Sequence, residues 1–318
     1  KPSTRSKKIM QNHLDCYQKV KKKCFKFITS QETKKEKFKN KEKMIKDFLI
    51  PICFWIFKHK PKNKTYIIGL AGGQGTGKTT ISSLIKLILS YYFKLNVFKV
   101  SIDDFYKTRK ERLKLSKTKH PLLLTRGVPG THDIDMMNKL FSNIKKTKFR
   151  TMLIPKFDKS IDDRYNKKFW YKIKKKPDIL ILEGWCVGAK PEKENTLYTP
   201  INKLEKNLDS KKKWRLHVNN QLKNKYAKLF NQMHSLLYLK AKNFNVLKSW
   251  RIKQEKKLQL KNKNKKNNKI MNNLEVLNFM MTYQRITQNM FKIAPKHSSI
   301  IIDLNDRHQI KRVKFNNA

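Results

Sequence analysis

The chain has 318 residues, which is enough for one large domain or two small ones with a substantial core. Its formal charge is +53, from 76 basic and 23 acidic residues, and 76 less 11 arginines leaves 65 lysines. These lysines are spread along the chain, with no localised basic stripe interleaved with aromatics. We therefore expect a solvated basic surface and no specific nucleic-acid partner.

The longest apolar stretch, residues 48–57, contains Pro51 and is too short to span a bilayer, so we expect no membrane partner. The four cysteines show neither metal-ligand spacing nor a dense disulfide framework, which indicates a reducing compartment. We predict a cytoplasmic location. Because the chain begins at Lys1 rather than Met, organellar targeting by an upstream segment remains an alternative.

Residues 1–45 are lysine-rich with scattered apolar positions and predict a helical N-terminal extension. A single domain over residues 46–318 follows, with a Lys/Asn-rich insertion at about 259–270. Five short apolar runs in this domain predict strands, at residues 66–71, 97–102, 178–182, 235–239 and 299–303.

Helical periodicity separates these runs, at residues 78–93, from about 131 onward, and at 272–291. Continuous apolar strands that alternate with helices are typical of a parallel sheet covered on both faces. The expected fold is therefore α/β, with a doubly wound, mostly parallel five-stranded sheet and flanking helices.

A glycine-rich run at residues 72–79 matches the phosphate-loop pattern G-x-x-x-x-G-K-[ST], between a predicted strand and a predicted helix. Its glycines let backbone N–H groups close around phosphates, and the helix N-terminus adds a positive dipole end. We expect Lys78 to reach the β- and γ-phosphates and the Thr79 hydroxyl to ligate Mg²⁺. The residues predicted to bind ATP are Gly72, Gly73, Gln74, Gly75, Thr76, Gly77, Lys78, Thr79 and Thr80.

Carboxylates follow two other predicted strands. Asp103 and Asp104 end the second strand, and Glu183 ends the third. In an open parallel sheet the carboxyl ends of the strands meet at one edge, so we expect these acids to lie beside the phosphate loop. We assign Asp103, with Asp104 as its substitute, to accept a proton from an attacking hydroxyl, and Asp103 and Glu183 to serve Mg²⁺. The alternative is that they are ordinary turn acids.

Two polar segments predict a site for the acceptor. In residues 126–133 two glycines and a proline fix a loop that carries Arg126, His132 and Asp133. In residues 155–164 Asp158 could hold a substrate hydroxyl and Arg164 an anionic group, while Arg126 could clamp a carboxylate or phosphate. A solvated loop with incidental ion pairs is the alternative for the second segment.

Arg251 lies in a helical pattern after the fourth strand, where it could swing over ATP and stabilise charge on the transferring phosphoryl group. A surface helix is the alternative for this segment.

The chain resembles the D-glycerate 3-kinase family of phosphate-loop kinases, over roughly residues 48–310. The matching segments, in order, are GGQGTGKTT (72–80), SIDDFY (101–106), HPLLLTRGVPGTHD (120–133), FDKSIDDR (157–164), ILILEGWCVG (179–188), WR with VN (214–219), WRIKQEKKL (250–258), YQRIT (283–287) and DLNDRHQI (303–310). A broader similarity is to uridine kinases, phosphoribulokinases and pantothenate kinases. In uridine kinases an Asp after the second strand is the general base, and Asp103 falls on that position.

The resemblance implies a phosphate-loop kinase fold with a lid, and transfer of the γ-phosphoryl group of Mg·ATP to D-glycerate to give 3-phosphoglycerate. ATP, Mg²⁺ and a small-molecule acceptor are the ligands that it implies. The chain departs from the family pattern in its Lys/Asn-rich N-terminus and in the insertion after Arg251, where a lid is expected. The other hypotheses are a kinase for another small acceptor, such as a nucleoside or a pantothenate-like molecule, and an ATP-binding regulatory protein with no acceptor.

Overall fold

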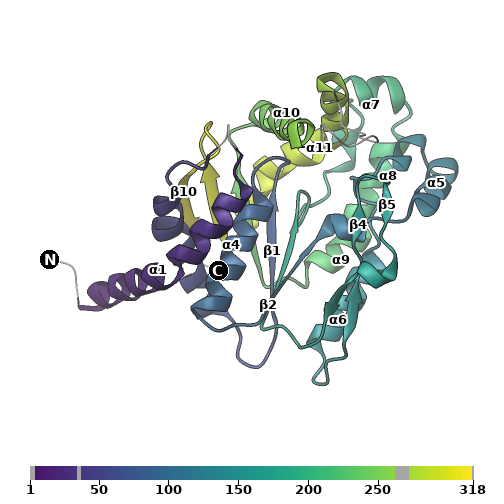
Figure 1. The fold of residues 1–318 in the computed structure, drawn as a ribbon. Coiled ribbons are helices and arrows are strands. Elements are labelled where there is room, and N and C mark those ends of the chain that lie inside the picture. Colours follow the sequence, from purple (N-terminus) through teal and green to yellow (C-terminus); the bar gives the residue numbers. More distant parts are fainter. Residues whose placement is uncertain (1–3, 34–36, 262–271, 317–318) are drawn as a thin grey trace.

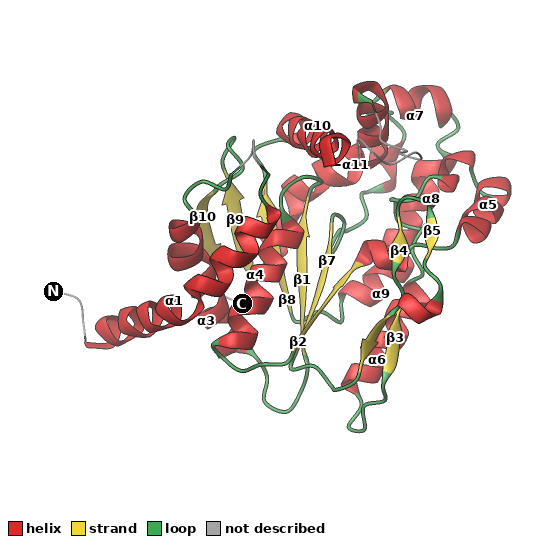
Figure 2. Ribbon diagram, viewed as in Figure 1, coloured by secondary structure: helices red, strands yellow, loops and turns green. Residues whose placement is uncertain are grey.

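The computed structural model describes residues 4–33, 37–261 and 272–316. At its centre is a six-stranded sheet in the order β10-β9-β8-β1-β7-β2, in which all neighbouring pairs except β10–β9 are parallel (Figures 1 and 2). The strands are β1 (Tyr66–Gly72), β2 (Val97–Ser101), β7 (Ile179–Gly184), β8 (Ser235–Lys240), β9 (Ile300–Leu304) and β10 (Ile310–Phe315). The predicted α/β class and the five predicted strands are confirmed.

The sixth strand, β10, was not predicted. It pairs with β9 at the edge of the sheet, and none of its residues is fully buried. An edge strand with that exposure needs no apolar run, so the segment IKRVKF gives only a weak strand signal.

Helices cover both faces of the sheet (Figure 1). Alternate residues of each strand belong to the cores on opposite faces. Tyr66, Ile68 and Leu70 of β1 belong to a core with α1 (Thr4–Gln31), α3 (Ile50–His59), α4 (Lys78–Tyr91) and α10 (Phe244–Lys261). Ile67 and Ala71 belong to a second core on the other face. The helices that contribute to this second core include α6 (Ile134–Lys145), α8 (Lys213–Gln221), α9 (Ala227–Phe230) and α11 (Asn273–His297).

The remaining helices are short: α2 (Lys41–Lys43), α5 (Arg109–Thr118) and α7 (Lys203–Leu208). The helix predicted from about residue 131 begins instead at Ile134, because the Asp133 carboxylate accepts the N–H of Met136 and caps it. The helix predicted over 272–291 extends to His297 as α11.

Two small hairpins lie between α6 and β7. In one, β3 (Met152–Ile154) pairs with β6 (Tyr171–Ile173), and in the other, β4 (Phe157–Asp158) pairs with β5 (Asp163–Arg164). Figure 2 shows both on the side of the sheet where β2 is the edge strand. The β4–β5 hairpin carries the second segment that was predicted to bind the acceptor.

The N-terminal helix α1 contributes to the same core as α3 and α4, with Cys16, Val20, Cys24 and Ile28 fully buried. The predicted boundary near residue 45 stays a prediction. Residues 262–271, which hold most of the insertion predicted at 259–270, lie outside the described residues. In the described parts of the chain, no helix combines the length and the apolar character that crossing a bilayer requires.

If α1 is part of the cooperative fold, Ile28→Ala should lower the free energy of unfolding by about 2–5 kcal/mol, because it leaves a cavity in a fully buried site. Ile9→Ala, at a position of the same helix that is 47% exposed, should change it by less than about 0.5 kcal/mol. Urea unfolding of both variants measures the difference. Equal small effects would show that α1 does not dock on the domain in solution.

Candidate active site

The phosphate loop joins β1 to α4 through two glycines with positive φ, Gly75 at 81° and Gly77 at 84°. Residues other than glycine rarely adopt this backbone, which explains why the motif needs them. Inside the loop, the Gly73 carbonyl accepts hydrogen bonds from Thr76 Oγ1 at 2.8 Å and from Lys78 Nζ at 3.0 Å. Removal from water lowers the pKa of Lys78 to about 8, against the opposing pull of Glu183 and Asp103.

Glu183 lies beside this loop because β7 pairs with β1 in a register that places it next to Leu70. Its Oε1 accepts a hydrogen bond from Thr79 Oγ1 at 3.0 Å, and its Oε2 accepts one from the Ser82 hydroxyl. Lys99 Nζ lies 3.8 Å from Glu183 Oε2. The structure therefore brings together two of the three residues that were predicted to serve the metal, Thr79 and Glu183, which come from separate segments.

Ser82 and Lys99 were not predicted. Ser82 lies one helical turn beyond Thr79, a spacing that a search for partners of Thr79 could have used. Lys99 carried no signal, because lysine is the default residue of this chain.

The donors at this point suit Mg²⁺, which prefers oxygen ligands and retains several waters when protein and phosphate supply the rest. Thr79 and Glu183 offer a hydroxyl and a carboxylate. Within residues 4–33, 37–261 and 272–316, no group of three or more His, Cys, Asp or Glu side chains could hold a metal without other ligands. The geometry fits an ion held jointly with a bound nucleotide.

Asp103 follows β2, which pairs with the other edge of β7, so the two acids share one end of the sheet. Its Oδ2 accepts from Lys159 Nζ at 2.8 Å, and its Oδ1 accepts from the Tyr106 hydroxyl at 3.0 Å. Burial favours the neutral acid, but the Lys159 ammonium and these hydrogen bonds together hold the pKa of Asp103 well below its usual value.

The neighbouring Asp104 has a different environment. Its Oδ1 accepts a long hydrogen bond, 3.4 Å, from the backbone N–H of Phe157. Burial raises the pKa of Asp104 to about 6, with a further contribution from the Asp103 charge. Of these two acids, it is the charge of Asp103 that raises the pKa of Lys78 against the effect of burial.

His132 is buried within an aromatic cluster. Its ring stacks on Tyr106 with centroids 4.6 Å apart, and its Nδ1 lies 2.7 Å from the Tyr226 hydroxyl. Burial lowers the pKa of His132 to about 4, so the ring is neutral at physiological pH. Among the described residues its buried Nε2 has no hydrogen-bond partner.

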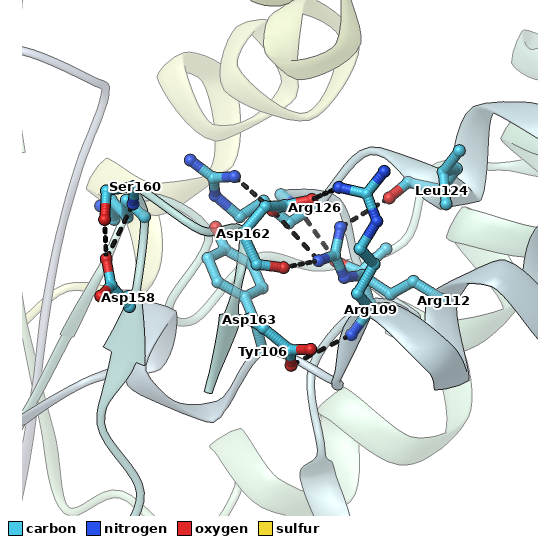
Figure 3. A network of polar contacts seen from close by, with 12 residues as sticks. Tyr106, Arg109, Arg112, Leu124, Arg126, Asp158, Ser160, Asp162 and Asp163 are labelled. Carbon is cyan, nitrogen blue, oxygen red and sulfur yellow. Dashed lines mark hydrogen bonds and ion pairs between the residues drawn. The ribbon is translucent and has the colours of Figure 1, made fainter. Parts of the chain in front are cut away.

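The other predicted acceptor residues all have partners within the protein, and Figure 3 shows those of Arg126 and Asp158. Arg126 pairs with Asp162, and Arg164 donates to Asp133 Oδ2 at 3.1 Å and to the Tyr106 carbonyl at 2.8 Å. Asp158 Oδ1 accepts from the backbone N–H of Ser160 at 2.8 Å. Asp133 and Arg164 therefore tie the loop at 126–133 to the β4–β5 hairpin.

Gly127, next to Arg126, lies so close to α11 that a side chain at this position would clash with it. A Cβ atom built at Gly127 would lie 2.0 Å from the Tyr283 hydroxyl oxygen, and the backbone φ of Gly127 is 143°. The Gly127 carbonyl accepts from Trp185 Nε1 at 3.1 Å. Tyr283 was not predicted as a site residue, although it begins the quoted segment YQRIT, because only the fold brings α11 to this loop.

Arg251 lies on α10, which packs against the phosphate loop; a Cβ atom built at Gly75 would be 3.3 Å from the Arg251 backbone nitrogen. The Arg251 guanidinium pairs with Glu255 Oε2 at 2.6 Å. Two cavities lie away from all these residues, one lined by Asn96, Phe98 and Ile173 and the other by Trp214, Val218 and Arg285.

A phosphate loop between a buried strand and a helix, with carboxylates after two neighbouring parallel strands, defines a phosphate-loop kinase. Residues 67–190 match the model of the phosphoribulokinase/uridine kinase family. An uncharacterized kinase of Schizosaccharomyces pombe, mug58, is 31% identical over 261 residues, which cover 77% of this chain and 91% of that protein. The chain belongs to this family of kinases.

The chloroplastic D-glycerate 3-kinase of Arabidopsis thaliana is 30% identical over 188 residues, covering 51% of this chain and 40% of that protein. The structure of a D-glycerate 3-kinase from Cryptococcus neoformans shares the fold, with a TM-score of 0.69 at 21% identity, over 85% of this chain and 97% of that one. The predicted fold class and the similarity to D-glycerate 3-kinases are thus confirmed. Family membership implies a nucleotide and a metal as cofactors, while the compartment stays a prediction.

Proposed function

We propose that the protein transfers the γ-phosphoryl group of Mg·ATP to a hydroxyl of D-glycerate, giving 3-phosphoglycerate and ADP. The observation that carries this proposal is that Asp103 follows β2, whose neighbour β7 ends in the Glu183 that meets Thr79, and that it pairs with Lys159 of the hairpin that carries Asp158 and Arg164. The names of the relatives in Arabidopsis and Cryptococcus support glycerate as the acceptor.

In this proposal the N–H groups of residues 72–80 surround the ATP phosphates, and Lys78 neutralises charge on the β- and γ-phosphates. Thr79 would ligate Mg²⁺ directly and Glu183 through water, with Asp103 nearby. An ion held by these residues would supply positive charge to offset that of the phosphates. Arg251, released from Glu255, would stabilise the transferring group, whose charge is spread over three oxygens.

The proposed role of Asp103 is to accept a hydrogen bond from the attacking hydroxyl and to take its proton as the new P–O bond forms and the bond to ADP breaks. The low pKa of Asp103 keeps it ionised over the working range of pH. In a loose transition state the proton leaves late, so orientation matters more than basicity.

We assign the acceptor to the space between the loop at 126–133 and the β4–β5 hairpin. Arg126 would bind the glycerate carboxylate, because a planar guanidinium suits a bidentate anion. Asp158 and Arg164 would hold the remaining polar groups, and His132 and Asp133 would shape the site from the other loop.

A coupled assay for ADP release, with purified protein and D-glycerate, uridine or pantothenate, tests the acceptor. We expect turnover with D-glycerate at least about 100-fold above the other two, since a site built for one set of polar groups rejects acceptors that leave those groups unpaired. Phosphorus NMR of the product distinguishes 3- from 2-phosphoglycerate. Turnover of only another acceptor would refute the glycerate assignment, and ATP binding with no acceptor would favour a regulatory protein.

A further inference from the structure

The loop between β4 and β5, residues 159–162, presents opposite charges to two groups that we assign to catalysis and acceptor binding. Its first residue, Lys159, donates to Asp103 Oδ2 at 2.8 Å. Its last residue, Asp162, accepts from Arg126 (Figure 3). An acceptor with a hydroxyl and a carboxylate would make the same two contacts: a donor to Asp103 and an anion on Arg126.

Asp162 pairs with more than Arg126. Arg112 NH2 lies 3.0 Å from its Oδ1 and Arg109 NH1 lies 3.7 Å from its Oδ2. The nearby Asp163 uses its Oδ1 to accept backbone N–H groups, those of Arg109 and Arg164. Among the described residues, Asp162 is therefore the carboxylate that pairs with all three guanidinium groups, and this cluster of Arg109, Arg112, Arg126 and Asp162 has an excess of positive charge.

The three arginines differ in how firmly they are held. Arg112 has no exposed side-chain surface and also donates to the carbonyls of Lys107 and Leu124. The Arg126 side chain is 25% exposed. Asp162 can therefore release Arg126 and stay neutralised by Arg112, so this exchange leaves no buried carboxylate unpaired.

We propose that Asp162 is an internal stand-in for the anionic group of the acceptor, and that an acceptor carboxylate binds Arg126 by replacing it. This inference rests on the proposed function in taking Arg126 as an acceptor residue. The exchange lowers the apparent affinity for every anionic acceptor by the fraction of molecules in which Arg126 is free. A neutral acceptor has no group to exchange and gains nothing at Arg126.

The test uses Asp162→Asn in the full chain. Asp162 has a φ of 59°, and Asn tolerates this left-handed backbone while losing the charge. The KM for D-glycerate should fall by about tenfold, the change that 1.4 kcal/mol produces. The KM for glycerol, which lacks the carboxylate, should stay within about twofold of the wild-type value, because glycerol has no anionic group to exchange with Asp162.

Two further variants make the result specific. Asp162→Gly, which also tolerates positive φ, should reproduce the lower KM if Asp162→Asn folds poorly. Asp135→Asn removes a carboxylate that is 72% exposed and pairs with Lys225, and it should leave both KM values unchanged. Equal or higher KM for D-glycerate in both Asp162 variants would overturn the proposal, since a merely structural Asp162 predicts weaker binding.

A second measurement does not depend on glycerate. Sulfate should raise the melting temperature of Asp162→Asn more than that of wild type or Asp135→Asn, because the variant opens an anion site on the arginines. Crystals of Asp162→Asn grown from sulfate should hold the ion at Arg112 and Arg126. If the wild type phosphorylates another acceptor, the glycerate proposal fails. The sulfate measurement then tests by itself whether an anion can replace Asp162 at Arg126. If glycerate is the substrate, no extra sulfate effect and an unchanged KM would refute the exchange alone.

Discussion

Asp103→Asn should lower kcat for D-glycerate by about 10²–10⁴-fold, the range that a positioned general base contributes. The amide cannot accept the proton, and it presents an uncharged oxygen to the acceptor hydroxyl. ATP affinity, measured by titration calorimetry, should change only a few-fold, because the contacts within the phosphate loop, through Gly73, Thr76 and Lys78, do not involve Asp103.

Asp104→Asn is the matched control, since it changes the adjacent acid and removes the same charge. Asp104 accepts from the Phe157 N–H, on the side of the hairpin, and should cost far less activity. The pH profile gives an independent measure. A base acts when deprotonated, so a base with the pKa of Asp104, about 6, would make kcat fall as pH drops through 6.

With Asp103 as the base, kcat stays level through that region, because the pKa of Asp103 lies well below its usual value. A steep loss of activity below pH 6 in the wild type, together with a larger defect in Asp104→Asn than in Asp103→Asn, would transfer the role to Asp104.

The sequence was enough to predict which residues lie at the carboxyl ends of the central strands. Runs such as residues 178–182 predict buried parallel strands, and the geometry of a parallel sheet then places Glu183 and Asp103 beside the phosphate loop. This inference needs only local patterns and one topological rule, and the contact between Thr79 and Glu183, both proposed to serve the metal, agrees with it.

The partners of the predicted side chains could not be predicted, because they come from distant segments. Arg126 meets Asp162, and His132 meets Tyr226, across separations of 36 and 94 residues. Lysine abundance hid Lys159 among many similar residues, although it makes an ion pair to Asp103 at 2.8 Å. The edge strand β10 was missed for the opposite reason, since its exposed residues lack the apolar run that marks a buried strand.

Lys78→Met should reduce kcat/KM for ATP and glycerate by about 10²–10³-fold, the cost of removing one preorganised charge-stabilising donor. The side chain keeps most of its apolar length and loses its charge. Lys86→Met is the matched control, because Lys86 lies on the same helix about 12 Å further along, outside the phosphate loop.

The Lys78→Met variant should not lower the stability of the fold. The pKa of Lys78 is lowered by desolvation, so folding disfavours its charged form, and this penalty applies at any pH below the lowered value of about 8. Replacing Lys78 by Met removes that penalty along with one hydrogen bond to Gly73, so urea unfolding at pH 7 should show equal or greater stability. Loss of activity with retained stability is the result expected of a lysine kept for phosphate; loss of both would assign Lys78 a structural role instead.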